Sequence, residues 1–212
     1  MEKVRDKIYS PDYSPYTGLY PVLELQVRGW ASTGVAFDIA IDEVNPKLIV
    51  EVGTWKGASA INMANICLQK GSDFEIVCID TFLGSVEHWT DADPTLLKPN
   101  LKNGRPNIYE QFLSNVIHSG LTDHITPFPI DSINGGLVLK KLGVLADLIY
   151  IDAGHEYESV SADLKLYKDI VRPGGVLLGD DWFHGPIKDA VRDVLGDVET
   201  LSHDKFMWKK PE

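Results

Sequence analysis

Runs of consecutive apolar residues alternate along the chain with stretches in which apolar residues recur every three or four positions. A short apolar run is typical of a strand buried on both faces, and the wider spacing is typical of a helix that covers a sheet. Strands are expected at residues 47–52, 74–80, 124–128, 146–152 and 176–180. Helices are expected at residues 33–44, 58–69, 108–119, 132–142, 156–171 and 187–195.

The order of these elements predicts the fold class. Strands that alternate with helices form an α/β domain built on a doubly wound, mostly parallel sheet. Residues 172–175 are expected to form a turn before the last parallel strand, and residues 198–208 two further strands as an antiparallel edge hairpin. The prediction is a seven-stranded, Rossmann-like sheet whose ligands lie beyond the carboxyl ends of its strands.

Two segments lack this periodicity. Residues 1–32 are rich in Tyr, Pro and turn formers, so they are expected to form an arm on the surface or a lid that excludes water from a pocket. Residues 33–212 are expected to form a single domain with that arm attached. Within it, residues 82–107 are a long insertion, and such loops in compact domains are typically functional or disordered.

Composition narrows the function classes. The chain has 212 residues, enough for one domain, and a formal net charge of -11, which would repel a nucleic-acid backbone. Cys67 and Cys78 show neither zinc-binding nor disulfide spacing. The first twenty residues lack the apolar stretch of a signal peptide, and no apolar run approaches the ~18 residues that span a membrane. We expect a cytoplasmic protein with no nucleic-acid or membrane partner.

A glycine-containing turn follows the first strand. Gly53 and Gly57 let the chain turn tightly and let a ligand approach the backbone, and the next helix begins with free N–H groups. Their spacing, G-x-x-x-G, differs from the denser glycine pattern of dinucleotide sites, and no Gly-Lys-Ser/Thr ending of a phosphate-binding loop follows. The turn therefore favours a ligand without a pyrophosphate.

Two further polar positions follow neighbouring strands. Asp80 ends the second strand, where a carboxylate can accept hydrogen bonds from ribose hydroxyls. Asp131 and Ser132 come just after the third, where an adenine edge would lie. A strand-end aspartate can instead cap a helix. The glycine turn and these two positions, in order on successive turns, predict an adenosine-containing ligand.

Three carboxylates come at the ends of the last two parallel strands. Asp152 ends the fourth strand, and Asp180 and Asp181 end the fifth. Neighbouring strands lie ~5 Å apart, so the three acids would converge, which is unfavourable unless protons or a cation compensate. Oxygen ligands suit Mg²⁺. Alternatively, Asp181 caps the next helix and Asp152 accepts from a backbone N–H.

Taken together, these motifs resemble the class I S-adenosylmethionine-dependent methyltransferases, and more closely the small-molecule O-methyltransferases of the macrocin and catechol type. The resemblance extends from about residue 47 to residue 195. It rests on residues 50–59 (VEVGTWKGAS), 78–84 (CIDTFLG), 147–157 (DLIYIDAGHEY) and 172–182 (RPGGVLLGDDW).

The resemblance implies S-adenosylmethionine as cofactor, with its methionine part near the glycine turn, its ribose near Asp80 and its adenine near Asp131. It also implies a divalent cation, Mg²⁺ or another, because macrocin-type enzymes carry acids at the places of Asp152, Asp180 and Asp181. The residues expected to bind the cofactor are Glu51, Gly53, Thr54, Gly57, Ser59, Asp80, Thr81, Asp131, Ser132 and Asp152.

Methyl transfer to oxygen needs an activated acceptor, since a neutral hydroxyl is a poor nucleophile. A metal would lower the pKa of the hydroxyl and orient its oxygen, and a base would take the proton. Asp152 and His155 are the expected catalytic residues, although catechol-type enzymes carry a lysine at the place of His155. His184 is a second candidate for the base. Candidates for acceptor contact or for the pocket lining are His88, Trp89, Trp55 and Trp182.

Several alternatives stay open. The protein could be a metal-independent methyltransferase in which His155 and Asp181 position the acceptor, or a nucleotide-binding module without catalysis. An NAD-dependent oxidoreductase is disfavoured by the glycine spacing. The acceptor is expected to be a small molecule, with sugar hydroxyl, phenol and catechol all open. The N-terminal arm is a candidate homodimer contact.

Overall fold

The computed structural model describes residues 3–19, 22–27, 29, 31–90 and 101–212, apart from the side chain of Glu87. Its strands are β1 (Leu48–Val52), β2 (Glu75–Asp80), β3 (Leu101–Lys102), β4 (Arg105–Pro106), β5 (Ile125–Pro129), β6 (Ala146–Ile151), β7 (Val171–Gly179), β8 (Glu199–Thr200) and β9 (Phe206–Lys209). Its helices are α1 (Val4–Ile8), α2 (Val35–Val44), α3 (Ala58–Gln69), α4 (Val86–Thr90), α5 (Ile108–His118), α6 (Ser132–Lys141), α7 (Tyr157–Ile170) and α8 (Gly185–Leu195).

Seven of these strands form one sheet in the order β5-β2-β1-β6-β7-β9-β8. The first five are parallel, and Val50 of β1 pairs with Val77 of β2 and Ile149 of β6. β9 runs antiparallel to β7, and β8 antiparallel to β9. The predicted doubly wound sheet with an antiparallel edge hairpin is confirmed, and the short β3–β4 pair forms a second sheet.

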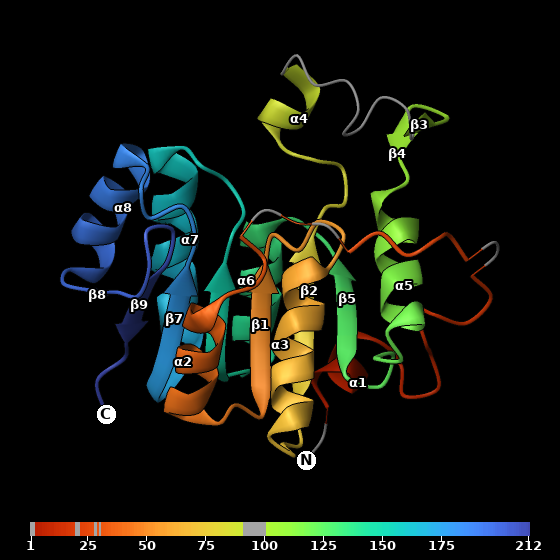
Figure 1. The fold of residues 1–212 in the computed structure, drawn as a ribbon, viewed down its shortest axis with the longest axis horizontal. Helices are drawn as coiled ribbons and strands as arrows, with labels where there is room; N and C mark the ends of the chain where they lie inside the picture. The colour runs from red at the N-terminus through yellow and green to blue at the C-terminus, as the bar shows by residue number, and fades with distance from the viewer. Residues whose placement is uncertain (1–2, 20–21, 28, 30, 91–100) are drawn as a thin grey trace.

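Helices cover both faces of the sheet, because its central strands are apolar on both sides (Figure 1). On one face, α2, α3 and α5 bury side chains such as Phe37, Met63 and Phe112. On the other, α6, α7 and α8 bury Leu139, Leu164 and their neighbours. The result is a three-layer α/β/α arrangement whose strands β1, β2, β6 and β7 end at a common rim. None of the helices described is long and apolar enough to cross a membrane.

The prediction of a turn at residues 172–175 is wrong, because β7 already begins at Val171. The register between β6 and β7 shifts between Ala146 and Leu148, and this irregularity accommodates the Pro-Gly-Gly sequence within the strand. Gly175 packs so closely that an added Cβ would lie 2.9 Å from the carbonyl oxygen of Asp147. The short elements α1, α4, β3 and β4 had no counterpart among the predicted elements.

The described part of the N-terminal arm lies against the β5 edge of the sheet and against α5 (Figure 1). The hydroxyl groups of Tyr9 and Tyr16 donate to the carbonyl oxygens of Pro127 and Ile125. Farther along, the amide of Gln26 donates to the side chain of Asn115 on α5. These contacts lead the arm toward the rim of the sheet. Its division from residues 33–212, and its action as a lid, stay predictions.

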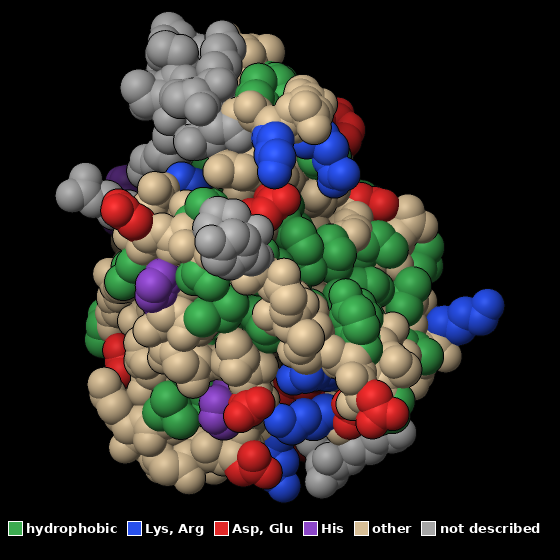
Figure 2. Space-filling view, turned by 90° about the vertical axis from the view of Figure 1, so that its right-hand side faces the viewer, with side chains coloured by type: hydrophobic (Ala, Val, Ile, Leu, Met, Phe, Trp, Pro, Cys, Tyr) green, Lys and Arg blue, Asp and Glu red, His purple; other side chains and the backbone are tan. Residues whose placement is uncertain are grey.

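Figure 2 views the molecule from the α5 side, where hydrophobic side chains gather at the centre and basic ones lie interspersed with acidic ones. The arm contributes exposed apolar residues, among them Val22, Leu25 and Val27, each at least 40% exposed. The expected homodimer contact through the arm stays a prediction. Residues 91–100 of the predicted insertion lie outside the described residues.

Candidate active site

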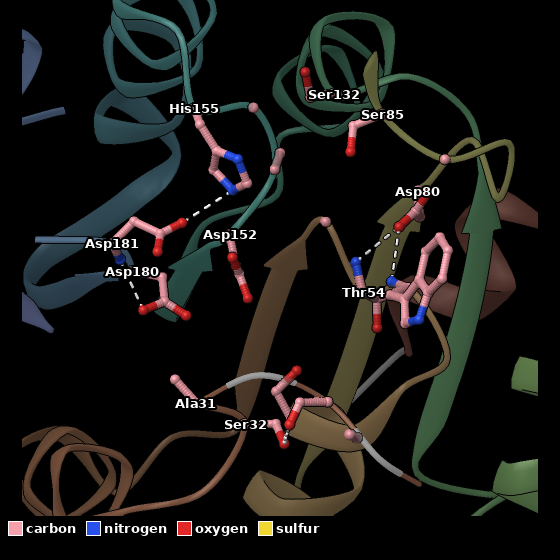
Figure 3. Close-up of a pocket in the computed structure, with 18 of the residues that line it drawn as sticks. Ala31, Ser32, Thr54, Asp80, Ser85, Ser132, Asp152, His155, Asp180 and Asp181 are labelled. Carbon is pink, nitrogen blue, oxygen red and sulfur yellow. Dashed lines mark hydrogen bonds and ion pairs between the residues drawn. The ribbon is translucent and has the colours of Figure 1, made fainter. Parts of the chain in front are cut away.

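A cavity of about 680 Å³ opens at the carboxyl ends of β1, β2, β6 and β7. In Figure 3, Thr54 and Asp80 lie on one side of it and Asp152, His155 and Asp181 on the other. Ser32 and Ala31 of the arm close it from a third direction. The expected cofactor residues that line it are Gly53, Thr54, Ser59, Asp80, Thr81, Asp131, Ser132 and Asp152.

Gly53 turns the chain at the end of β1 with a left-handed φ of 83°. Its amide donates to the carbonyl of Ile79 at 2.9 Å, which ties the turn to β2. A Cβ on Gly53 would lie 2.0 Å from the carbonyl oxygen of Asp152. Because no side chain fits there, glycine allows the ends of β1 and β6 to meet beneath the cavity.

Asp80 organises the turn above β2 with both carboxylate oxygens. One oxygen accepts from the amides of Thr54 and Trp55 at 3.0 and 2.8 Å, and the other accepts from the amide of Phe82 at 2.7 Å. Burial raises the pKa of Asp80, and these three N–H groups oppose the rise. A carboxylate can accept about four hydrogen bonds, so one site is left for a ligand hydroxyl.

Glu51 and Gly57 do not line the cavity but support residues that do. The fully buried Glu51 accepts from the Thr54 hydroxyl at 2.6 Å and from the Ser59 hydroxyl. Its burial raises its pKa to about 7. Gly57 precedes α3 with a φ of 84°, and the ring of Phe112 occupies the space that a Cβ would need. Both residues therefore shape the glycine turn from behind.

Asp131 caps the first turn of α6, because its side chain accepts from the amide of Asn134. Asp131 nevertheless lines the cavity together with Ser132. The backbone carbonyl of Ser132 accepts from the hydroxyl of Tyr167 at 2.6 Å, which fixes this wall against α7. Asp131 can therefore cap α6 and also form part of the wall that would contact a ligand.

The predicted meeting of Asp152, Asp180 and Asp181 takes place at the opposite wall. The Tyr150 hydroxyl lies between the first two acids, 3.1 Å from an Asp152 oxygen and 2.8 Å from an Asp180 oxygen. Burial and the neighbouring carboxylates, Asp180 before Asp181, raise the pKa of Asp152 well above its usual value. Asp152 therefore resists ionisation unless a positive charge comes close.

Asp180 already has a positive partner within the chain. The Lys205 ammonium lies 2.7 Å from one Asp180 oxygen, and both side chains are almost fully buried. The same oxygen accepts from the amide of Asp181, and the other accepts from Tyr150. Asp180 thus lines the cavity with oxygens that already have partners within the chain. The sequence analysis did not single out Lys205. The one feature that could have drawn attention to it is a basic residue immediately before the apolar residues of β9.

His155 and Asp181 form a pair at the cavity surface. The Nε2 atom of His155 lies 2.9 Å from an Asp181 oxygen, and this contact lowers the pKa of Asp181. One ligand atom each of Asp152, His155 and Asp181 lie within 4.8 Å of one another, which suits a single metal ion. Asp181 adopts a left-handed φ of 55°, a conformation unfavourable for a residue with a Cβ.

Other left-handed residues cluster at the same rim. Trp55 and Phe82 follow β1 and β2 with φ of 50° and 56°, and Ala31 of the arm has φ of 45°. Such conformations cost free energy and persist only where surrounding contacts hold them, and they concentrate at functional sites. Their positions add a backbone argument, independent of side-chain chemistry, that this rim is the functional one.

Of the aromatic candidates, Trp55 and His88 line the cavity with their rings stacked 4.2 Å apart. Trp182 is directed elsewhere: its indole N–H donates to Thr200 and its ring packs on Phe206. Trp89, His184 and Trp182 are not among the residues that line the cavity, whereas Phe183, which the sequence did not single out, is.

The sequence of this domain matches a known protein family. Residues 50–182 match a family described as a methyltransferase domain, and the chain belongs to that family. The match covers the glycine turn, Asp80 and the acidic wall.

Two curated relatives act on sugars according to their names. A rhamnosyl O-methyltransferase of Mycobacterium bovis is 24% identical over 141 residues, 66% of this chain and 48% of the relative. A tetracenomycin rhamnosyl 4'-O-methyltransferase of Streptomyces olivaceus is 31% identical over 157 residues, 71% of this chain and 59% of the relative. The chain thus spans about half the length of these relatives.

Solved structures share the fold. A calicheamicin methyltransferase, CalS11, superposes with a TM-score of 0.60 at 19% identity, covering 82% of this chain and 77% of that one. An O-methyltransferase from Bacillus cereus in complex with SAH gives 0.58 at 16% identity, covering 99% of this chain and 86% of that one. The predicted methyltransferase fold is confirmed.

Proposed function

We propose that this protein transfers the methyl group of S-adenosylmethionine to a hydroxyl of a small molecule, with a sugar as the favoured acceptor. The observation that carries the proposal is one cavity lined by Asp80 on one side and by the His155–Asp181 pair on the other. Family membership supports methyl transfer, the SAH complex of a structural neighbour supports the donor, and the names of both curated relatives favour a sugar.

The donor would lie over the glycine turn. The remaining acceptor site on Asp80 suits a ribose hydroxyl, and the wall of Asp131 and Ser132 suits the adenine. The hydroxyls of Thr54 and Ser59, oriented by Glu51, face the methionine end. This arrangement directs the sulfonium methyl toward the acidic wall.

The chemical step needs a base at that wall, and His155 is the residue we assign. The acceptor oxygen attacks the methyl carbon, the carbon–sulfur bond breaks, and the sulfonium becomes a neutral thioether as the hydroxyl proton passes to His155. Asp181 orients the imidazole and stabilises its protonated form through the 2.9 Å contact.

The acidic wall fits a divalent cation such as Mg²⁺. Asp152 and Asp181 present carboxylate oxygens toward the cavity, and the surplus negative charge there calls for compensation. When bound, the cation would polarise the acceptor hydroxyl and lower its pKa. Asp180, occupied by Lys205, is the member of the expected set least suited to ligate it. A metal-independent reaction is the alternative, in which His155 and Asp181 position the acceptor without a cation.

The experiment follows label from methyl-labelled S-adenosylmethionine into rhamnosides, simple phenols and catechols. Transfer to a rhamnoside is expected, and loss after chelation with recovery on adding Mg²⁺ would establish the metal. His155→Ala should lower the rate about 10²–10⁴-fold with unchanged donor affinity. His124→Ala, just before β5 at the end of the strands opposite the cavity, is the control. Absence of transfer to every acceptor from a protein that binds the donor would overturn the proposed activity. A homodimer and a cytoplasmic location remain proposals.

A further inference from the structure

The buried cation Lys205 connects the end of β7 with the N-terminal arm. It immediately precedes β9, which lies between β7 and the edge strand β8. Its side chain is 2% exposed, and its ammonium is 2.7 Å from Asp180. The same ammonium donates to the backbone carbonyl of Ala31, in the N-terminal arm, at 3.0 Å. Asp204 lies 3.6 Å away and completes the polar surroundings of the charge.

The surroundings of this ammonium fix its position. It lies 5.4 Å from the ring centre of Phe37 and 5.6 Å from that of Tyr150, within the range of cation–π attraction. Since two carboxylates, a carbonyl and two rings surround it, the Lys205 side chain is held rigidly. Asp180, in turn, contacts Tyr150, whose hydroxyl reaches Asp152. A continuous row of contacts therefore joins the arm to the acidic wall.

We propose that Lys205 is a positioning residue that latches the arm onto the acidic wall, so that Ala31 and Ser32 close the cavity over its ligands. Ala31 and Ser32 line the cavity directly. The left-handed backbone of Ala31 needs an external contact to persist, and the Lys205 bond to its carbonyl is such a contact. A hydrogen bond from a charged donor is strong enough to bias this closure.

A second consequence concerns the acids. Asp180 is paired with Lys205, whereas Asp152 and Asp181 lie with His155 in the group that could hold a metal ion. Removal of Lys205 alone would leave the buried Asp180 charge unpaired, which destabilises the fold. In that variant, loss of the latch could not be distinguished from loss of stability. The informative variant is the neutral pair Lys205→Met with Asp180→Asn, which removes the latch without leaving a buried charge.

The test is amide hydrogen exchange of arm peptides spanning residues 22–34 in the whole chain without ligand, a readout that does not depend on methyl transfer. In this segment the amides of Leu23 and Gln26 donate to Ser114 and Asn115, so opening of the arm exposes them. The double variant should exchange there about tenfold faster or more, while peptides of β1 and β6 stay protected. Lys205→Arg, which keeps the charge and a donor, should exchange like the wild type. Lys209→Met, from the strand β9 that follows Lys205, is the control, because Lys209 pairs with Glu43 on the surface.

Calorimetric titration with S-adenosylmethionine is the second readout, and this one rests on the proposed function. The double variant should bind the donor more weakly by about the same factor as its arm opens, whereas Lys209→Met should not. Wild-type exchange of the arm peptides (residues 22–34) in a folded double variant would overturn the latch, whatever the donor does. Faster exchange in Lys205→Arg as well would also overturn it, since a retained charge should retain the closure. Should the double variant not fold, the milder neutral pair Lys205→Gln with Asp180→Asn replaces it, with the same expected result and the same contradicting one. A protein with a protected arm that binds no donor would instead refute the proposed function.

Discussion

Substitution of Asp80 by Asn tests whether this carboxylate holds the donor-binding turn together. The change is nearly isosteric, but it replaces one acceptor oxygen with an NH₂ donor. Asp80 accepts three backbone N–H groups, two on one oxygen and one on the other. In the better orientation the amide oxygen keeps Thr54 and Trp55, and the NH₂ group faces the N–H of Phe82.

The magnitude follows from these contacts. Loss of one charge-assisted hydrogen bond and the donor-to-donor contact cost about 1.5–3 kcal/mol, and relief from burying a charge offsets part of this. We expect the free energy of unfolding to fall by about 1–3 kcal/mol, which for a chain of 212 residues lowers the Tm by roughly 2–10 °C. Because the ribose site is on the same carboxylate, donor affinity should fall about 10- to 100-fold.

Thermal unfolding and calorimetric titration with S-adenosylmethionine measure the two effects. Asp189→Asn is the matched control, since Asp189 is an exposed carboxylate on α8 whose contact with Arg192 spans 3.8 Å, and it should change neither quantity. The reasoning is refuted if Asp80→Asn binds the donor as tightly as the wild type and unfolds at the same temperature.

Other consequences of the structure can be measured in the same way. Gly53→Ala should destabilise the fold by more than about 3 kcal/mol because its Cβ would meet the Asp152 carbonyl, whereas Gly120→Ala, equally left-handed but in open space, should cost only about 1–2 kcal/mol; equal denaturant midpoints would contradict this. Burial raises the pKa of Asp163 to about 6 and that of Glu51 to about 7, so each folded carboxyl retains its proton where the unfolded one has lost it, and stability falls as the pH rises toward these values. Asp163→Asn should therefore add up to about 3 kcal/mol at pH ~8 and nothing at pH ~3, as shown by denaturant unfolding at both pH values; a gain independent of pH would count against it. Glu51→Gln should likewise be more stable than the wild type above about pH 7 and should lose this advantage below about pH 4.5. An advantage that grows as the pH falls would disprove the assigned burial effect.

Most of the fold could be predicted because the period of the apolar residues changes clearly between strands and helices. The five parallel strands and the edge hairpin follow from that pattern alone. Residues 172–175 could not be read correctly, since Pro-Gly-Gly favours a turn locally and only the pairing with β6 keeps it in the strand. Local propensity was overridden there by tertiary contacts.

The polar residues of the site could be predicted from the sequence, but the side chains with which they pair could not. The acids at the strand ends had to share one rim once the strands were parallel, which is why Asp80 and Asp152 line one cavity. The pairing of Lys205 with Asp180 joins the ends of β7 and the edge hairpin, and no local spacing reports it. Glu51 was expected to contact the ligand, yet its burial behind Ser59 depends on how α3 packs on β1.

The most direct measurement of the central claim is calorimetric titration of the purified wild-type protein with S-adenosylmethionine. One donor molecule should bind to each chain, with a dissociation constant in the micromolar range. The absence of heat and of any shift in melting temperature at millimolar donor would contradict the account at its foundation.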